Sequence, residues 1–256
     1  MEKGIALQGF LSVFAGSSIR SAMISQVLFG ESYVILEHMG PWTRISMEID
    51  GLEGWISSSS VQTPELPVAD PGKKLMALRP LTTLTDLMTH SRIPVPAGSI
   101  WPGEPGVPFE IRNRKLVMDE PADWFECRMN ADPELIGEQL LSVPFLQGGR
   151  SGMGLDGSGL VQFVGKTLGL AWPRYSPELS GLGQTLNFIG EVRKGDLAFF
   201  DSPEGEIIHS GVVLDRGRIL HVHDLVRIDR LDHQGIYNSH LKAYTHHLRI
   251  IKRPSA

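Results

Sequence analysis

The organisation of this chain turns on one glycine-rich segment, which reads Gly148-Gly149-Arg150-Ser151-Gly152-Met153-Gly154-Leu155-Asp156-Gly157-Ser158-Gly159. An amphipathic run over residues 160–170 follows at once and predicts a helix that begins at about Ser158. A glycine-rich segment followed directly by a helix is typical of a chain that places a nucleophile at the helix N-terminus. There, unpaired N–H groups and the helix dipole stabilise an anion. The central position is Gly157, which has no side chain, so a site laid out for nucleophilic attack lacks its nucleophile.

The composition is that of a globular protein able to bury a core. Of its 256 residues, 41% are hydrophobic and 21% are charged. The formal net charge of -5 argues against a nucleic-acid partner. No apolar run approaches the length of about 18 residues that a membrane helix needs, so we expect no membrane partner.

Cysteine usage and the first residues bear on the compartment. The N-terminus, Met1-Glu2-Lys3-Gly4, begins no convincing signal peptide. The single cysteine, Cys127, leaves no internal disulfide and lies in no nucleophile motif, so we interpret it as a buried small apolar residue. These features favour a cytoplasmic protein, with export by a non-classical route left open.

The first half of the chain predicts two small barrels. Residues 1–62 alternate short apolar stretches with turns, and strands at this spacing favour a small β-barrel. A proline-rich polar linker is predicted over residues 62–74. Residues 75–128 again predict strands and turns, which we interpret as a second, more degenerate barrel.

Residues 130–256 predict an α+β domain, because helices come first and a run of strands follows. Asp132 and Pro133 are typical of a helix start, with Asp132 as the cap. After the helix at about Ser158, a short helix is predicted to end at about Gly183. The predicted strands cover residues 196–200, 207–214, 218–223 and 248–251.

Several motifs of this domain occur in the order typical of one protein family. They are Pro144-Phe145-Leu146-Gln147-Gly148-Gly149-Arg150-Ser151, Gly154-Leu155-Asp156-Gly157-Ser158-Gly159-Leu160-Val161-Gln162, 195–200, 209–212, 220–224 and a tail over 226–246. The chain resembles the NlpC/p60 cell-wall cysteine peptidases, in the subgroup of gamma-D-glutamyl-L-diamino acid endopeptidases with N-terminal bacterial SH3-like domains. The resemblance implies a papain-like NlpC/p60 domain preceded by two small SH3-like β-barrels.

The resemblance also implies roles for individual residues. Gly157 occupies the position of the nucleophile, His209 that of the general base, and His221 that of the residue orienting the base. The implied substrate-binding residues, in a cleft between the first barrel and the last domain, are Asp156, Ser158, Ser176, Leu52, Trp55 and Tyr175. Asp156 and Ser158 correspond to groups that hold the free amine of the substrate.

Four positions depart from the family pattern. Gly157 replaces the nucleophilic Cys, Leu52 a Tyr of the amine pocket, Tyr175 an Asp, and Gln147 a Trp. Ser158 does not replace the nucleophile, because one step along a helix turns a side chain by about 100°. Changes spread over one cleft fit a natural protein that has stopped catalysing.

We therefore expect a catalytically silent relative that recognises a murein stem peptide with a free amine, such as L-Ala-γ-D-Glu-diamino acid, or a protein partner. A role in bacterial cell wall recycling follows from that ligand. We expect no cofactor and no metal. The alternative is an active-type cysteine endopeptidase that hydrolyses γ-D-Glu–diamino acid bonds, here in an inactivated variant.

A third reading concerns the histidines. His221 and His223 point to one face of a strand, since side chains alternate along it. With His209 or Asp224 they would form a metal site for metal-assisted hydrolysis. The doublet His246-His247 is expected at the surface.

Overall fold

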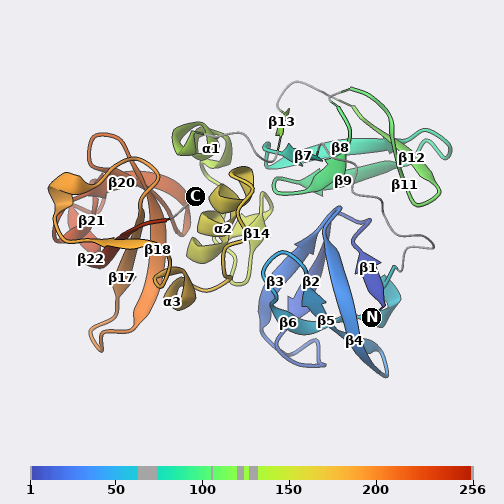
Figure 1. The fold of residues 1–256 in the computed structure, drawn as a ribbon, viewed down its shortest axis with the longest axis horizontal. Coiled ribbons are helices and arrows are strands. Elements are labelled where there is room, and N and C mark those ends of the chain that lie inside the picture. The colour runs from blue at the N-terminus through green and yellow to red at the C-terminus, as the bar shows by residue number, and fades with distance from the viewer. Residues whose placement is uncertain (1, 63–73, 105, 120–123, 127–131, 255–256) are drawn as a thin grey trace.

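The computed structural model describes residues 2–62, 74–104, 106–119, 124–126 and 132–254, which form three lobes (Figure 1). The first lobe is a six-stranded antiparallel sheet with the order β1-β4-β5-β6-β2-β3. Its strands are β1 Lys3–Ile5, β2 Phe10–Phe14, β3 Met23–Leu28, β4 Ser32–Met39, β5 Trp42–Met47 and β6 Glu53–Ser57, followed by a 3-10 turn, η1 Ser58–Ser60. Alternate side chains, among them Val13, Val27 and Ile45, fill its core, as the predicted alternation requires.

The second lobe consists of short strands in two sheets, ordered β10-β7-β13 and β11-β12-β8-β9. Their bounds are β7 Lys74–Ala77, β8 Leu81–Asp86, β9 Arg92–Pro96, β10 Ile100–Pro102, β11 Phe109–Ile111, β12 Arg114–Met118 and β13 Trp124–Glu126. Trp101 stacks on Phe109 with ring centroids 5.9 Å apart, and Phe29 of the first lobe meets Trp101 edge-on at 6.4 Å. The two lobes therefore share a hydrophobic core.

Two features predicted from sequence fall outside the described residues. Only the ends of the predicted linker, Gln62 and Lys74, are described, and Cys127 lies outside. The division of the chain at 1–62, 75–128 and 130–256 stays a prediction.

The third lobe packs helices on a seven-stranded sheet ordered β16-β22-β17-β18-β19-β20-β21. The helices are α1 Pro133–Leu140, α2 Gly157–Thr167 and α3 Ser176–Leu179, with a 3-10 turn, η2 Ile189–Glu191. The strands are β14 Arg150–Ser151, β15 Gly154–Leu155, β16 Gln184–Leu186, β17 Leu197–Asp201, β18 Ile207–Leu214, β19 Arg218–His223, β20 Leu225–Leu231, β21 Gly235–Asn238 and β22 Ala243–Arg253. Because β22 pairs with both β17 and β21, the pairing of β17 to β22 forms a closed ring.

Local sequence signals explain where the helices begin. Asp132 caps α1, its side chain accepting the Glu134 N–H at 3.0 Å, as predicted. α2 begins one residue before the predicted start, because Asp156 caps it by accepting the Gly159 N–H at 2.7 Å. α3 is shorter than predicted and ends at Leu179. No helix in the described ranges is long and apolar enough to cross a membrane.

The strand predictions were incomplete at the end of the chain. β20 and β21 were not predicted, and β22 is longer than the four residues expected. Polar and charged residues interrupt the apolar residues of β20 and of the first part of β22, and β21 has only four residues, so none of them shows a long apolar run. These strands supply two groups of the site described below.

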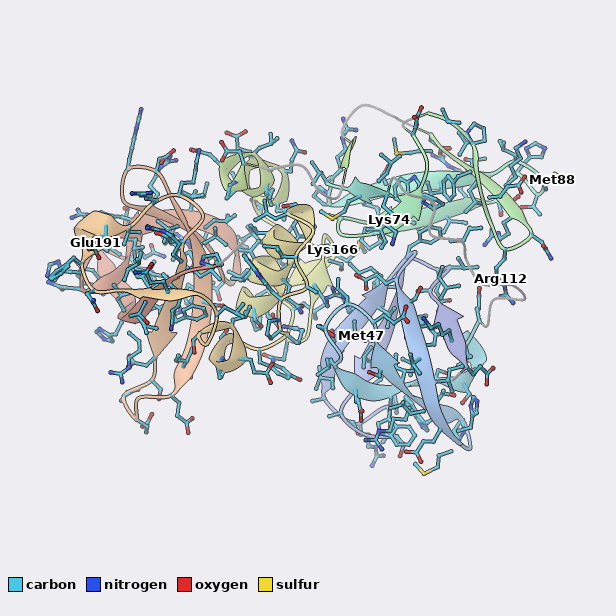
Figure 2. All side chains as sticks on the ribbon, viewed as in Figure 1. Met47, Lys74, Met88, Arg112, Lys166 and Glu191 are labelled. Atoms are coloured by element: carbon cyan, nitrogen blue, oxygen red, sulfur yellow. The ribbon has the colours of Figure 1, made fainter. Side chains whose placement is uncertain are left out.

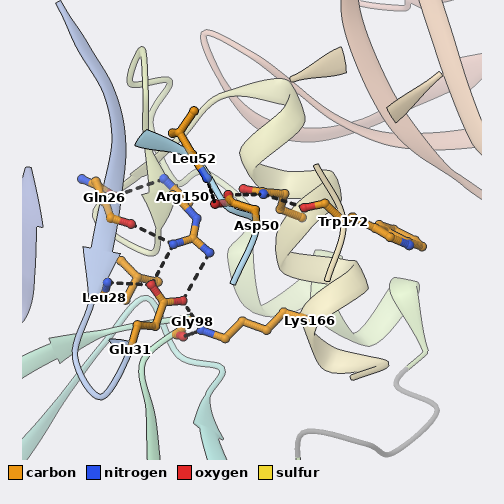
Figure 3. A network of polar contacts seen from close by, with 10 residues as sticks. Gln26, Leu28, Glu31, Asp50, Leu52, Gly98, Arg150, Lys166 and Trp172 are labelled. Atoms are coloured by element: carbon orange, nitrogen blue, oxygen red, sulfur yellow. Dashed lines mark hydrogen bonds and ion pairs between the residues drawn. The ribbon is translucent and has the colours of Figure 1, made fainter. Parts of the chain in front are cut away.

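A buried ionic cluster joins the three lobes (Figure 3). Glu31, between β3 and β4, accepts Arg150 Nη1 at 2.8 Å and Lys166 Nζ at 2.6 Å. Lys166, on the face of α2 toward the barrels (Figure 2), also donates to the Gly98 carbonyl at 2.5 Å. Burial alone would raise the pKa of Glu31, but the two cations outweigh it and lower that pKa to about 2. The cluster therefore ties the hairpin that leads into α2 to the first and second lobes.

Candidate functional site

The first residue of α2 faces an imidazole. An ideal Cβ built on Gly157 lies 3.1 Å from His209 Nδ1 and 3.2 Å from the Ser210 carbonyl oxygen. Both distances are shorter than an ordinary van der Waals contact, so the His209 ring has to shift by a few tenths of an ångström before a side chain fits there. Because Gly157 is the first residue of α2, this position also lies at the helix N-terminus, where backbone N–H groups lack partners within the helix. The structure thus brings Gly157 and His209 together.

Three adjacent strands carry a chain of hydrogen bonds behind His209. His209 on β18 and His221 on β19 meet through Nε2 and Nδ1 at 3.2 Å. His221 Nε2 lies 3.1 Å from Asp229 Oδ2 on β20, and Arg227 Nε donates to the same oxygen at 2.5 Å. Sequence reasoning missed Asp229, although the motif tail contained it.

Burial and hydrogen bonding set the protonation states of His209, His221 and Asp229. Burial lowers the pKa of His209 well below its usual range, and the nearby imidazoles lower it further. Burial also lowers the pKa of His221, against the attraction of Asp229. For Asp229, burial favours the acid, but hydrogen bonds from His221 and Arg227 outweigh it and lower the pKa. At neutral pH both imidazoles are therefore neutral and Asp229 is ionised.

These charges assign the ring protons. Ionised Asp229 only accepts, so His221 donates through Nε2 and accepts through Nδ1. His209 then donates through Nε2, and its Nδ1 lone pair faces Gly157. A general base needs this tautomer.

His246 corrects the expectation that the doublet lies at the surface. Its ring, on β22, stacks on His209 with centroids 4.1 Å apart, and burial lowers its pKa to about 4. Only His247 is exposed. The closed strand pairing explains the difference, since β22 pairs with β17 and β21 and closes the ring, so that the His246 ring meets those of His209 and His221.

Asp156 and Ser158 lie beside Gly157, but their side chains already accept hydrogen bonds from Arg174. Arg174, itself 2% exposed, donates to both carboxylate oxygens of Asp156, at 2.9 and 2.6 Å, and to Ser158 Oγ at 2.7 Å. Asp156 also accepts the N–H groups of Gly148 and Gly159. An ammonium group of a ligand would therefore compete with a buried guanidinium for this carboxylate.

A groove of about 260 Å³ opens above Gly157. Its lining residues are Phe145, Gln147, Asp156, Gly157, Ser158, Tyr175, Ser176, Pro177, Ile207, Ile208 and His209. Ser176 is buried and shares a hydrogen bond of 2.9 Å with Ser210. Ile208 and Phe145 are 61% and 48% exposed, so one wall offers apolar surface to a ligand.

The structure does not bring Leu52 and Trp55 into this groove, whose lining residues all come from the third lobe. Leu52 packs against the core of the first barrel, and Trp55 lies in β6 opposite Phe14 and Arg44. The first barrel instead reaches α2 through Asp50, which accepts Gln162 Nε2 at 2.8 Å. The expected cleft between barrel and domain is thus not the groove that contains Gly157.

Comparison with known proteins matches two parts of the chain. The model of the NlpC/P60 family matches residues 142–248, and that of the bacterial dipeptidyl-peptidase Sh3 domain matches residues 13–61. A gamma-D-glutamyl-L-lysine dipeptidyl-peptidase of Bacillus subtilis (strain 168) is 25% identical over 214 residues, which cover 77% of this chain and 71% of that protein. One of Bacillus cereus is 32% identical over 87 residues, covering 33% of this chain and 26% of that protein.

Solved structures show the same fold. An NlpC/P60 family protein of Bacillus cereus ATCC 10987 superposes with a TM-score of 0.83 at 16% identity, over 98% of this chain and 99% of that one. An NlpC/P60 endopeptidase of Photobacterium damselae subsp. piscicida gives a TM-score of 0.69 at 15% identity, over 97% and 70% of the two chains.

The chain therefore contains an NlpC/P60 domain with a preceding bacterial SH3-like domain, which confirms the predicted family and fold. It is homologous to the gamma-D-glutamyl-L-lysine dipeptidyl-peptidase of Bacillus subtilis.

Proposed function

We propose that the groove above Gly157 binds a murein stem peptide, of the type L-Ala-γ-D-Glu-diamino acid, without cleaving it. The observation that carries this proposal is the missing side chain at the start of α2, directly opposite His209 Nδ1. No thiolate can form at that position, so no acyl-enzyme forms there. By analogy with triad deletions in serine peptidases, loss of the nucleophile costs on the order of 10⁴- to 10⁶-fold in kcat.

The groove keeps groups that recognise a peptide. Backbone N–H groups at the start of α2 are suited to a carbonyl oxygen, and His209 Nδ1 is suited to an amide N–H. Phe145 and Ile208 offer apolar surface to the ligand's side chains. Arg174 already donates hydrogen bonds to both carboxylate oxygens of Asp156. We therefore expect the free amine of the peptide to contribute less to affinity here than in the homologous peptidases.

The test is calorimetric titration of the full chain with murein tri- and tetrapeptides, together with thermal shift. We expect one peptide per chain, and about three- to tenfold weaker binding for Phe145→Ala, since one truncated contact side chain typically costs about 1 kcal/mol. Phe188→Ala is the matched control, because Phe188 is 70% exposed and does not line the groove. Absence of heat and of any thermal shift at millimolar peptide would overturn the proposal.

A second candidate is an active-type endopeptidase in an inactivated variant. The intact chain from Asp229 through His221 to His209 favours it, since a base is still oriented toward position 157. The variant Gly157→Cys separates the two readings in an assay for release of the diamino acid. Robust release of the diamino acid by Gly157→Cys supports the endopeptidase. No detectable release, with peptide binding retained, supports a protein that only binds the peptide.

A further inference from the structure

Four imidazoles gather on one side of the closed strand ring, behind the groove. His209 comes from β18, His221 and His223 from β19, and His246 from β22. The His246 ring lies 4.1 Å from that of His209, 5.8 Å from that of His221 and 5.2 Å from that of His223, measured between centroids. Neither the recognition of a peptide nor the hydrogen-bond chain to Asp229 requires His246.

We propose that His209, His221 and His246 bind a divalent transition metal ion of the zinc class. One ring nitrogen of each residue lies within 4.8 Å of the other two. The nitrogens His209 Nε2 and His221 Nδ1 are 3.2 Å apart. In a tetrahedral zinc site with Zn–N bonds of about 2.0–2.1 Å, neighbouring ligands are about 3.3–3.4 Å apart, so this pair already has nearly the required separation.

The remaining ring nitrogens have partners that would hold the ligands in place. His221 donates Nε2–H to Asp229, and Arg227 donates two further hydrogen bonds to the same carboxylate. Metal-ligating histidines commonly donate their other N–H to a carboxylate in this way. His246 Nδ1 lies 2.9 Å from Thr245 Oγ1, which leaves Nε2 of that ring as the ligand atom.

The geometry selects the third ligand. Ring nitrogens of His209, His221 and His246 converge within 4.8 Å of one another. The third ligand is therefore His246, and not His223 as the strand alternation alone suggested.

Metal binding would change what the groove offers a ligand. In the metal-free state His209 Nε2 carries the ring proton and Nδ1 accepts. With Nε2 on the metal, the proton moves to Nδ1, which then donates toward the space above Gly157. Zinc would therefore favour an acceptor, such as a carbonyl or carboxylate oxygen, at this point of the groove.

The experiment uses the full chain, stripped with chelator and then titrated with Zn²⁺ against a chromophoric competitor. Co²⁺ serves as a spectroscopic probe, since its visible bands report tetrahedral nitrogen ligation. We expect one metal ion per chain. His246→Ala should weaken zinc binding by more than about 100-fold, because loss of an outer partner alone costs about 10- to 100-fold.

His247→Ala is the matched control, as His247 is the exposed neighbour, and it should bind zinc like the parent chain. His246→Gln, checked by circular dichroism for folding, keeps the size of the side chain and should lose the cobalt bands. Less than about 0.2 zinc per chain, or equal affinity in His246→Ala and the parent, would overturn the proposal. Loss of binding in His223→Ala with full binding in His246→Ala would also overturn it.

Discussion

At Gly157 no side chain faces His209, although the hydrogen-bond chain from His209 through His221 to Asp229 is present. The helix N-terminus, the Nδ1 lone pair of His209 and the groove all converge on the space that a side chain there would enter. The close approach of His209 to the ideal Cβ places the imidazole partly in that space. Reintroducing a side chain therefore requires a small movement of the ring.

A thiol introduced by Gly157→Cys should be unusually acidic. The helix N-terminus at the start of α2 stabilises a thiolate, and the free Nδ1 of neutral His209 faces this position and can accept the thiol proton, so we expect a thiol pKa below the ordinary value of about 8.5. The pH dependence of alkylation measures it, in a Cys127→Ser background that leaves one thiol in the chain. A pKa at or above the ordinary value would contradict the geometry described for His209.

Arg174 should be structural because it neutralises a buried carboxylate. Arg174→Gln leaves Asp156 without its cation, and breaking a buried pair of this kind costs about 3–5 kcal/mol. Arg249→Gln is the control, since Arg249 is 62% exposed and lies 3.7 Å from Asp201, and should change stability by less than about 1 kcal/mol. Chemical denaturation measures both. Equal stability of the two variants would show that Arg174 is dispensable.

At the scale of single elements, capping residues decide where the helices begin. Asp132 and Asp156 each accept a backbone N–H in the first turn, and both helices start directly after them. The strands of the site are positioned differently, through pairing with neighbours far along the chain. The closed ring of β17 to β22 is what brings four imidazoles together.

The cap of α1 gives a prediction at this scale. Asp132→Ala should lower the free energy of unfolding by about 1 kcal/mol, because one N–H at the helix start loses its acceptor. Glu138→Ala, at an exposed position of the same helix, should have little effect. Thermal or denaturant unfolding distinguishes them, and a smaller loss for Asp132→Ala than for Glu138→Ala would be incompatible with a capping role.

The whole molecule is joined by the cluster of Glu31, Arg150 and Lys166. It contains two cations and one carboxylate in a buried place where three lobes meet. Such a cluster holds the segment before α2 in a fixed position relative to the first and second lobes. These two lobes therefore support the site without lining the groove.

Glu31 predicts an acid-dependent loss of stability. Its pKa falls from 4.5 to about 2 on folding, so its contribution is complete above pH 4.5 and disappears as pH falls toward 2. The shift corresponds to about 3 kcal/mol. Denaturation at pH 7 and at pH 3 should show this loss in the parent chain, and a smaller pH-dependent loss in Glu31→Gln.

Glu37→Gln is the control for that experiment, because Glu37 pairs with Arg44 at the surface. Its pH dependence should match that of the parent chain. An identical pH dependence of stability in Glu31→Gln and the parent would remove the assignment to Glu31.

The order of motifs from Pro144 onward was enough to predict the family and the missing side chain at Gly157, while the Asp132 cap and the amphipathic run after Ser158 predicted the two longer helices. These are contiguous features, and capping or chain turning depends on residues a few positions apart. The same reasoning identified His209 and His221, because each lies in a short strand motif.

Other features required the folded chain. Asp229 and His246 join the histidines only through strand pairing across β17 to β22, and neither has a local signal of its own. Arg174 reaches Asp156 from 18 residues away, and Leu52 packs against the core of the first barrel and does not line the groove. Such contacts depend on long-range register and packing, which residues adjacent in sequence do not specify.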